Sequence, residues 1–249
     1  MSDTEAGDLE TSHVRDLVTA NRILAHHRVF DAWGHISIRS PHDPARFFMS
    51  TSRAPALVVE QDVVELNVDT GEVVGERTSY AERHIHAGIY RRRANIQAVV
   101  HTHSSGLIPF GAVGRPLRAI AHTDAFLIDG CPMFEIRDET DDHTMLVESS
   151  QLGDALARRL GDAAIVLMRG HGATVVAPSL REVVYRAIYA SHAADLELTV
   201  WGLGDAPRYL GEQEARAAAS AIAATAQRPW ELWSAQVGRP ANGKDRHDR

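Results

Sequence analysis

The stretch Ala98-Val99-Val100-His101-Thr102-His103 decides how this chain is interpreted, because it places two imidazoles at the end of an apolar strand. Successive side chains of a strand point to opposite faces, so His101 and His103 lie side by side while Thr102 points away. A strand can present two ligands to one metal ion in this way. The chain has 14 histidines, so the pair could also be ordinary polar surface. Unpaired imidazoles beside core-type valines are costly, and both interpretations stay open from the strand alone.

A third histidine follows in Met168-Arg169-Gly170-His171-Gly172. The glycines on either side of His171 let the backbone approach a site closely. Three neutral imidazoles that converge on one point suit zinc, iron and other first-row divalent ions.

Length and composition predict one large domain. The chain has 249 residues, of which 44% are hydrophobic and 6% aromatic, which is enough to bury a full core. We expect the domain to cover residues 11–239, with disordered ends at residues 1–10 and 240–249. The formal net charge is -7 and the only tight basic cluster, Arg91-Arg92-Arg93, closes an expected helix. The sequence therefore predicts no nucleic-acid partner.

The cysteine content and the absence of long apolar segments indicate where in the cell the protein acts. Cys131 is the only cysteine, so an intrachain disulfide is excluded. The segment Met1–Glu10 is polar and acidic rather than a signal peptide, and no apolar run approaches the roughly 18 residues of a membrane span. We expect a soluble, cytoplasmic protein with no membrane partner.

Hydrophobic periodicity alternates between helical and strand patterns, without repeats or low complexity. A capping box at Ser179-Leu180-Arg181-Glu182 opens a long helix that reaches about Leu203. Trp230 and Trp233 are predicted to be packing anchors. The other expected elements are a helix carrying Val14, Leu17, Val18 and Leu24, strands at 36–39, 47–50, 63–67, 97–102 and 163–168, and helices at 79–92 and about 211–226. This order predicts an α/β layer protein with helices covering a largely antiparallel sheet.

The helix expected before the histidine strand carries another candidate. Glu82 and His86 are four residues apart and share a helix face, which Tyr90 extends by one turn. If this helix docks on the strand, Glu82 can reach the metal as a fourth ligand or as a proton carrier. The alternative is a surface ion pair between Glu82 and a neighbouring arginine, which spacing alone favours.

Together these motifs resemble the class II aldolase/adducin family. The matching segments, which span about residues 12–203, are Glu82-x-x-x-His86-x-x-x-Tyr90, Ala98-Val99-Val100-His101-Thr102-His103-Ser104, Gly170-His171-Gly172, Gly34-His35-Ile36-Ser37 and Ser50-Thr51-Ser52-Arg53. The resemblance implies a three-layer α/β/α fold with a central, mainly antiparallel sheet. It also implies a homotetramer whose active sites lie near subunit interfaces.

For the site, the resemblance implies that His101, His103 and His171 bind one divalent metal ion per subunit. Glu82 would be an acid/base or an additional ligand. The ligand set admits zinc, manganese, iron or cobalt.

Two departures from the family pattern concern the substrate. Sugar-phosphate aldolases of this family typically carry Gly-Asn-x-Ser and a Ser-Gly pair to hold the phosphate, whereas this chain has His35 and Arg53 at the altered positions. Bulky side chains there put phosphate binding in doubt. The Arg53 guanidinium suits a carboxylate, and His35 adds a donor or acid beside it. Both residues could instead stabilise their loops.

One branch of the family is similar at these positions, namely decarboxylases of hydroxylated aromatic dicarboxylates such as 3-hydroxy-2-methylpyridine-4,5-dicarboxylate and dihydroxyphthalates. The similar segments are Gly34-His35-Ile36-Ser37, Ser52-Arg53, Ala54-Pro55, Pro109-Phe110-Gly111 and His122-Thr123-Asp124-Ala125-Phe126. Ser52, Arg53 and His122 are accordingly expected to bind substrate. His122 has no functional signal of its own and could equally be a satisfied structural histidine.

The implied reaction is a metal-dependent, non-oxidative decarboxylation in aromatic catabolism. An aromatic carboxylate with an adjacent hydroxyl can chelate a cation, which stabilises the charge that develops as carbon dioxide leaves. Glu82, and after it His35, are the candidate proton donors, and Arg53 would hold the second carboxylate. The alternatives are an aldolase or lyase acting on a small hydroxy-carbonyl compound, an iron-dependent oxygenase and a non-enzymatic adducin-like module. The last is disfavoured because all three histidines are present.

Overall fold

The computed structural model describes residues 3–238. Its helices are α1 (Asp3–His26), α2 (Arg83–Arg92), α3 (Ile108–Val113), α4 (Ser150–Leu160), α5 (Leu180–Gly202), α6 (Glu212–Ala223) and α7 (Gln227–Gly238). Its short 3₁₀ helices are η1 (Pro55–Leu57), η2 (Glu60–Asp62), η3 (His122–Asp129) and η4 (Ile136–Asp138). Residues 3–10, which we expected to be disordered, extend α1 toward the N-terminus, and residues 240–249 lie outside the described part.

Seven strands form one sheet in the order β3-β2-β1-β4-β7-β6-β5. They are β1 (His35–Arg39), β2 (Arg46–Ser50), β3 (Val63–Asn67), β4 (Ala98–Thr102), β5 (Met133–Phe134), β6 (Ile165–Met168) and β7 (Gly172–Ala177). All neighbouring strands are antiparallel except β5 and β6, which are parallel. The histidine strand β4 lies in the middle, where both faces are covered and its five residues are buried.

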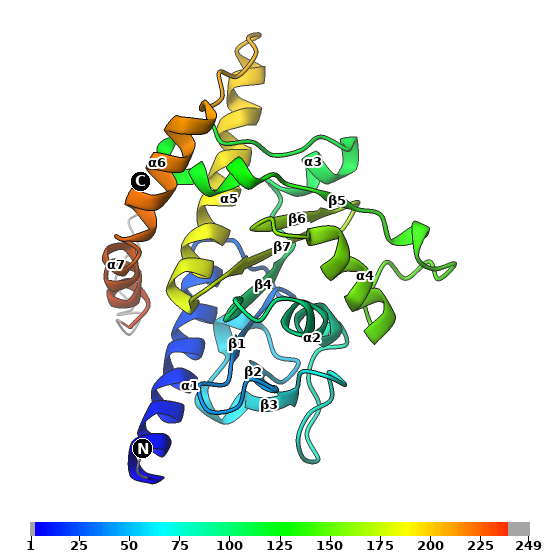
Figure 1. Ribbon diagram of the computed structural model, residues 1–249, viewed down its shortest axis with the longest axis vertical. Coiled ribbons are helices and arrows are strands. Elements are labelled where there is room, and N and C mark those ends of the chain that lie inside the picture. Colours follow the sequence, from blue (N-terminus) through cyan, green and yellow to red (C-terminus); the bar gives the residue numbers. More distant parts are fainter. Residues whose placement is uncertain (1–2, 239–249) are drawn as a thin grey trace, which may run out of the picture.

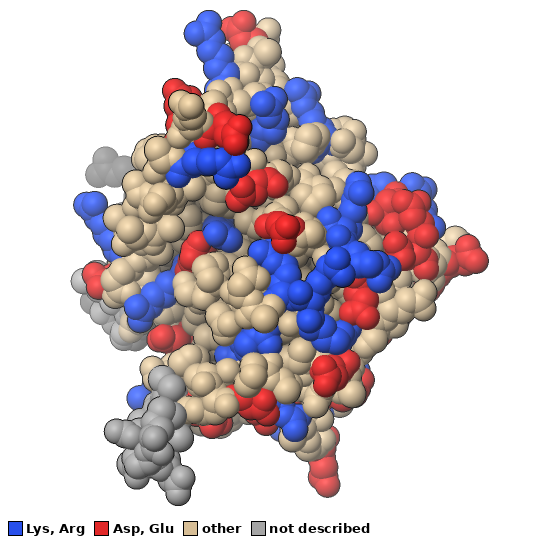
Figure 2. Space-filling model, in the orientation of Figure 1, with Lys and Arg blue, Asp and Glu red and all other residues tan. Residues whose placement is uncertain are grey.

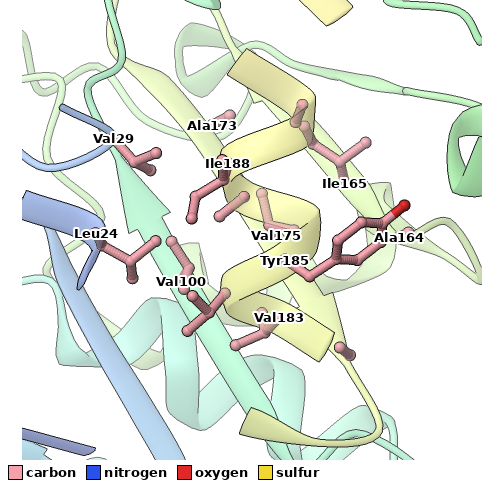
Figure 3. Packing of buried hydrophobic residues seen from close by; sticks show 14 of the residues in the cluster. Leu24, Val29, Val100, Ala164, Ile165, Ala173, Val175, Val183, Tyr185 and Ile188 are labelled. Carbon is pink, nitrogen blue, oxygen red and sulfur yellow. The ribbon is translucent and has the colours of Figure 1, made fainter. Parts of the chain in front are cut away.

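Helices cover both faces of this sheet, which gives the predicted three layers (Figure 1). Helices α1, α5 and α7 contact one another on one face, and α2 packs against α4 on the other. Strand β4 contributes to both cores in alternation: Val100 packs with the α1/α5 side and Val99 with the α2/α4 side. Figure 3 shows the first core, where Val100 and Val175 meet Val183 and Ile188 of α5. The period of two therefore turns His101 toward α2.

Some elements differ from the sequence prediction. Helix α2 begins at Arg83, not at residue 79, and Glu82 is its N-cap residue. The segment after α6 forms a further helix, α7, which buries Trp230 and Trp233 as predicted. Its apolar positions are too sparse to give a clear helical period, and the two tryptophans were the only signal that it packs against the core.

The surface carries charged side chains of both signs, as the composition of the sequence indicates. Figure 2 shows Lys and Arg interspersed with Asp and Glu on the visible face. Within residues 3–238, no helix combines the length and apolar character that crossing a lipid bilayer requires.

Candidate metal centre

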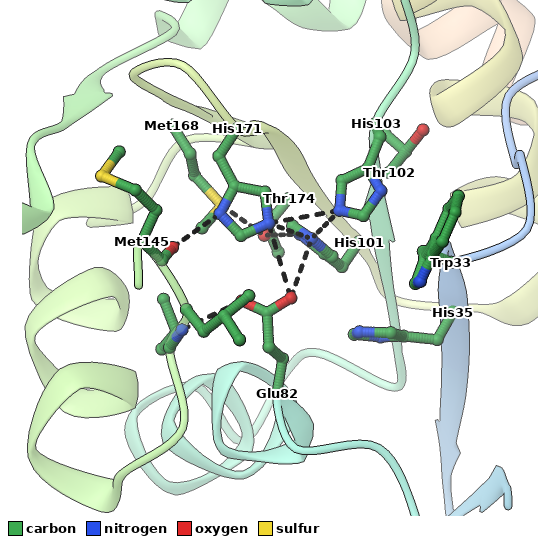
Figure 4. Close-up of polar contacts among 12 residues, drawn as sticks. Trp33, His35, Glu82, His101, Thr102, His103, Met145, Met168, His171 and Thr174 are labelled. Carbon is green, nitrogen blue, oxygen red and sulfur yellow. Dashed lines mark hydrogen bonds and ion pairs between the residues drawn. The ribbon is translucent and has the colours of Figure 1, made fainter. Parts of the chain in front are cut away.

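Three imidazoles converge at the end of β4. The Nε2 atom of His101 lies 3.1 Å from Nε2 of His103 and 3.3 Å from Nε2 of His171, and the last two are 3.2 Å apart. His101 comes from β4, His103 from the residue after it, and His171 from the β6–β7 turn (Figure 4). The three ligands that the sequence placed on one site therefore form a triangle of facing nitrogen atoms.

Glu82 completes the group from the N-terminal end of α2. Its Oε2 atom lies 3.6 Å from His101 Nε2 and 3.4 Å from His171 Nε2. Its Oε1 atom accepts a hydrogen bond of 2.9 Å from the backbone N–H of Val147. Glu82 is only 7% exposed. The alternative of a surface ion pair with arginine is therefore wrong.

The outer nitrogens of the three imidazoles face other groups, which frees the Nε2 atoms for a ligand. His171 Nδ1 lies 2.9 Å from the carbonyl oxygen of Met145, and His101 Nδ1 lies 3.3 Å from the Thr174 hydroxyl. His103 Nδ1 faces Asp31 Oδ1 at 3.6 Å. When Nδ1 of a neutral histidine carries the proton, Nε2 presents a lone pair. Such outer contacts are typical of metal-binding histidines.

The dimensions of the triangle fit a small divalent ion. Nitrogen ligands at about 2.0–2.1 Å from a tetrahedral ion lie about 3.3–3.4 Å from one another. The separations of 3.1–3.3 Å among the three Nε2 atoms are close to this. The four ligand atoms, including that of Glu82, all lie within 4.8 Å of one another. These residues could therefore hold one divalent metal ion, as the family resemblance implied.

Burial and mutual charge set the protonation of the group. Burial disfavours charge on Glu82, but the imidazoles of His101 and His171 outweigh it and lower the pKa of Glu82 to about 2. Burial lowers the pKa of His101 well below its usual value. Burial also acts on His171, yet its contact with Glu82 prevails and raises the His171 pKa. The carboxylate of Glu82 therefore favours the protonated form of His171, whereas burial favours the neutral form of His101.

His35 lies beside this centre. Strand β1 pairs with β4 so that His35 is opposite His101, and the two rings are 5.0 Å apart between centroids. Figure 4 shows the His35 ring reaching toward Glu82. The ring also stacks on Tyr80 at 4.7 Å. Sequence reasoning placed His35 near the substrate, and the structure brings it beside the candidate metal ligands.

Arg53 and Ser52 lie on the exposed loop after β2. The Arg53 Nη1 atom pairs with Asp62 at 3.0 Å, which leaves Nε and Nη2 without a hydrogen bond among residues 3–238. The Arg53 carbonyl accepts a hydrogen bond from the Tyr80 hydroxyl at 2.5 Å. Since Tyr80 also stacks on His35, this loop is tied to the His35 side of the centre.

His122 is not brought to the group. It begins η3, which packs against α5 and α6, and its side chain is exposed. Within the described residues, no contact joins His122 to the four ligands.

Several residues around the centre escaped the sequence analysis. Val147, Met145 and Thr174 orient the ligands through contacts that no local motif signals. Trp33 is 68% exposed on the loop whose Asp31 faces His103, and Figure 4 shows its indole near the centre. The sequence carries no signal for this role, because the exposure of Trp33 beside the candidate ligands is visible only in the structure.

Comparison with known proteins identifies the family of this chain. Residues 15–198 match the family described as "Class II Aldolase and Adducin N-terminal domain". The chain belongs to this class II aldolase family. It is 34% identical to "Decarboxylase tropJ" of Talaromyces stipitatus, over 90% of this chain and 93% of that one. It is 30% identical to a 3,4-dihydroxyphthalate decarboxylase of Arthrobacter keyseri, over 80% of this chain and 82% of that one.

A solved structure confirms the fold of this class II aldolase family member. L-fuculose 1-phosphate aldolase from Glaciozyma antarctica PI12 superposes with a TM-score of 0.78, covering 94% of this chain and 92% of that one at 19% identity. The predicted class II aldolase fold with a mainly antiparallel sheet is therefore confirmed. The family and its decarboxylase relatives make the chain an enzyme of lyase type.

Proposed function

We propose that this protein is a metal-dependent, non-oxidative decarboxylase of a hydroxylated aromatic dicarboxylate of the dihydroxyphthalate or hydroxypyridine-dicarboxylate type. The triangle of Nε2 atoms next to a buried Glu82 carries the proposal. It occurs in a chain whose relatives include named decarboxylases at 34% and 30% identity.

The metal would be held by His101, His103 and His171, with Glu82 as a fourth ligand or as the acid/base. A divalent ion there supplies positive charge that stabilises the negative charge developing on the substrate as carbon dioxide leaves. Glu82 is fixed for either role, because the Val147 N–H binds one carboxylate oxygen and directs the other toward the imidazoles. We assign delivery of a proton to the ring carbon to Glu82, with His35 as the second candidate. Because the pKa of Glu82 is about 2 and its carboxylate is ionised, Glu82 would first take up the proton of the substrate hydroxyl next to the leaving carboxylate.

The substrate would bind between the metal ligands and the loop after β2. Arg53 keeps two guanidinium nitrogens free of Asp62, and these suit the second carboxylate. Ser52 adds an exposed hydroxyl on the same loop. The exposed indole of Trp33 offers a face for an aromatic ring.

Two further parts of the proposal concern the assembly and the catabolic role. We propose a homotetramer with active sites near subunit interfaces, acting in aromatic catabolism. Since no contact joins His122 to the four candidate ligands within residues 3–238, we propose that His122 contacts the substrate bound by a neighbouring subunit.

Carbon dioxide release from a panel of hydroxylated aromatic dicarboxylates tests this function. The panel contains dihydroxyphthalates and 3-hydroxy-2-methylpyridine-4,5-dicarboxylate, each incubated with and without a chelator. We expect turnover that the chelator abolishes and that added divalent metal restores. Absence of carbon dioxide from every compound, together with retro-aldol cleavage of a sugar phosphate, would show an aldolase instead.

Arg53 gives a sharper test of the substrate class. Lysine keeps the charge at this position but loses the planar fork. Arg53→Lys should raise KM for a dicarboxylate about 10- to 100-fold, the size of a charged hydrogen bond. It should leave KM for the matching monocarboxylate unchanged. Equal effects on both substrates would assign Arg53 to its loop through the pair with Asp62.

A further inference from the structure

A row of buried polar side chains leads away from the centre, starting at His35. The Nδ1 atom of His35 lies 2.7 Å from Nε2 of His86, and Nδ1 of His86 lies 2.6 Å from the Ser37 hydroxyl. The Ser37 hydroxyl lies 2.8 Å from that of Tyr90, which reaches the carbonyl oxygen of Gln97 at 3.5 Å. His35, Ser37, His86 and Tyr90 are each at most 2% exposed. We call these four side chains the relay.

Two periodicities build the relay. His35 and Ser37 are two residues apart and share a face of β1, while His86 and Tyr90 are four apart and share a face of α2. Two strand residues rise about 6.6 Å and four helix residues about 6 Å, so the two pairs stay in step. Glu82 lies one turn before His86 along the same helix. The N-terminal end of α2 that places Glu82 beside the candidate metal ligands is therefore one turn from the helix face that carries His86 and Tyr90.

The relay has a preferred direction, because its far end can only accept. A backbone carbonyl has no proton, so Tyr90 donates to Gln97. Ser37 can then donate to Tyr90, His86 Nδ1–H to Ser37, and His35 Nδ1–H to His86 Nε2. All four protons are used in this arrangement. The opposite direction makes one bond fewer, and it leaves an N–H at His35 Nε2 that no hydrogen bond uses within residues 3–238.

The far end is held in place by Arg39. Its guanidinium lies 4.6 Å from the centroid of the Tyr90 ring and donates to the Tyr90 carbonyl at 2.9 Å and to the Ile96 carbonyl at 3.2 Å. These contacts hold Tyr90 of α2 beside the segment that leads into β4. The acceptor end of the relay is therefore rigid, as a device that sets a tautomer requires.

We infer that the relay holds His35 in the tautomer protonated on Nδ1, so that its Nε2 lone pair faces the centre and accepts a hydrogen bond from a substrate hydroxyl group. Ser37, His86 and Tyr90 are positioning residues in this arrangement. His35 then faces the centre as an acceptor, so Glu82 rather than His35 delivers the proton to the ring carbon. The inference rests on the proposed function for the identity of the substrate. The tautomer itself is a property of the free protein.

The tautomer can be measured without any substrate. In protein labelled with ¹⁵N-histidine and loaded with diamagnetic Zn²⁺, the ring nitrogen shifts show which nitrogen carries the proton, and His35→Gln assigns the signals. We expect His35 protonated on Nδ1. In Tyr90→Phe the Ser37 hydroxyl is free to donate to His86, so the proton of His35 should move toward Nε2. Tyr209→Phe, which removes a hydroxyl bound to Glu197 outside the relay, should leave the shifts unchanged.

Kinetics connect the tautomer to the substrate. With an active hydroxylated substrate, Tyr90→Phe should lower kcat/KM about 10-fold, which is the usual effect of removing a residue that orients a functional side chain without contacting the substrate. The control is an analogue that keeps the hydroxyl next to the leaving carboxylate and carries a methoxy group in place of the other hydroxyl. The methoxy group cannot donate to His35, so Tyr90→Phe and the unaltered protein should have the same kcat/KM for this analogue. Ser37→Ala breaks the same relay and should repeat both results if Tyr90→Phe folds poorly.

Two results would overturn the inference: a His35 protonated on Nε2 in the unaltered protein, or shifts that neither Tyr90→Phe nor Ser37→Ala changes. If the tautomer is as inferred but no aromatic acid is decarboxylated, the proposed function fails while the relay stands.

Discussion

His171 Nδ1 and the carbonyl oxygen of Met145 are 2.9 Å apart, and Met145 adopts a φ of 66° to place that oxygen. Residues other than glycine seldom occupy this left-handed region, and strain of this kind is concentrated at functional sites. A backbone group in an uncommon conformation therefore orients one of the three candidate metal ligands.

Two variants test whether the backbone conformation of Met145 is needed for metal binding. Met145→Gly adopts the same φ without strain and should keep the carbonyl in place, so metal affinity should stay unchanged. Met145→Val is β-branched and disfavours this conformation, so it should weaken metal binding about 10-fold by displacing the acceptor of His171. Competition with a fluorescent chelator measures both affinities. Equal affinities in the two variants would show that this carbonyl does not orient His171.

Thr174 tests the outer contact of His101. Its hydroxyl lies 3.3 Å from His101 Nδ1 and also contacts the sulfur atom of Met168. Thr174→Val keeps the shape but removes the partner, and we expect metal affinity to fall about 10- to 100-fold. Thr199→Val is the control, since among residues 3–238 the Thr199 hydroxyl bonds only to the Asp195 carbonyl of its own helix. A Thr174→Val protein that binds metal as tightly as the control contradicts the assignment.

The shifted pKa values of Glu82 and His171 predict how the free energy of unfolding of the metal-free protein depends on pH. The folded pKa of Glu82, about 2, is below its ordinary value of 4.5, so its contribution is present above pH 4.5 and is lost as the pH falls toward 2. His171, whose pKa Glu82 raises, adds stability that is lost as the pH rises above 6.5. Glu82→Gln should flatten both limbs in urea unfolding measured across this range. Parallel curves for the two proteins would mean that the pair contributes nothing.

Metal removal should lower thermal stability. An ion that binds only the folded chain adds about 2.7 kcal/mol at 100 times its dissociation constant. For a domain of this size that corresponds to a shift in Tm of about 5–10 °C. Differential scanning fluorimetry with and without a chelator measures the shift, and His103→Ala should abolish it. If a chelator leaves Tm unchanged in protein shown to contain metal, the ion does not stabilise the fold.

The sequence predicted the parts of the molecule that rest on local periodicity. Strand β3 has the predicted bounds, and Ser179 caps α5 by accepting from the N–H of Glu182 as the capping box indicated. The triangle of His101, His103 and His171 came from spacing within one family pattern. These features were predictable because their residues either are close together in the sequence or follow the order of motifs in the family pattern.

The remaining features depend on contacts between distant segments. Val147 meets Glu82 across 65 positions, and the relay joins β1 to α2 across 49 to 53. No periodicity in either segment reports such a contact. The start of α2 at Arg83 is another example, since Glu82 leaves the helix interior and turns its carboxylate toward the ligands.

The candidate metal ligands and the residues expected to bind substrate come from different segments of the chain, which bears on how such enzymes acquire new reactions. His101, His103 and His171 come from the end of β4, the residue after it and the β6–β7 turn. His35 and Arg53, which depart from the sugar-phosphate pattern, come from β1 and the loop after β2. Substitutions in β1 and in the loop after β2 can select a different molecule without disturbing the candidate metal ligands. A lineage of such proteins can therefore exchange substrates one loop at a time while the candidate metal ligands are inherited unchanged.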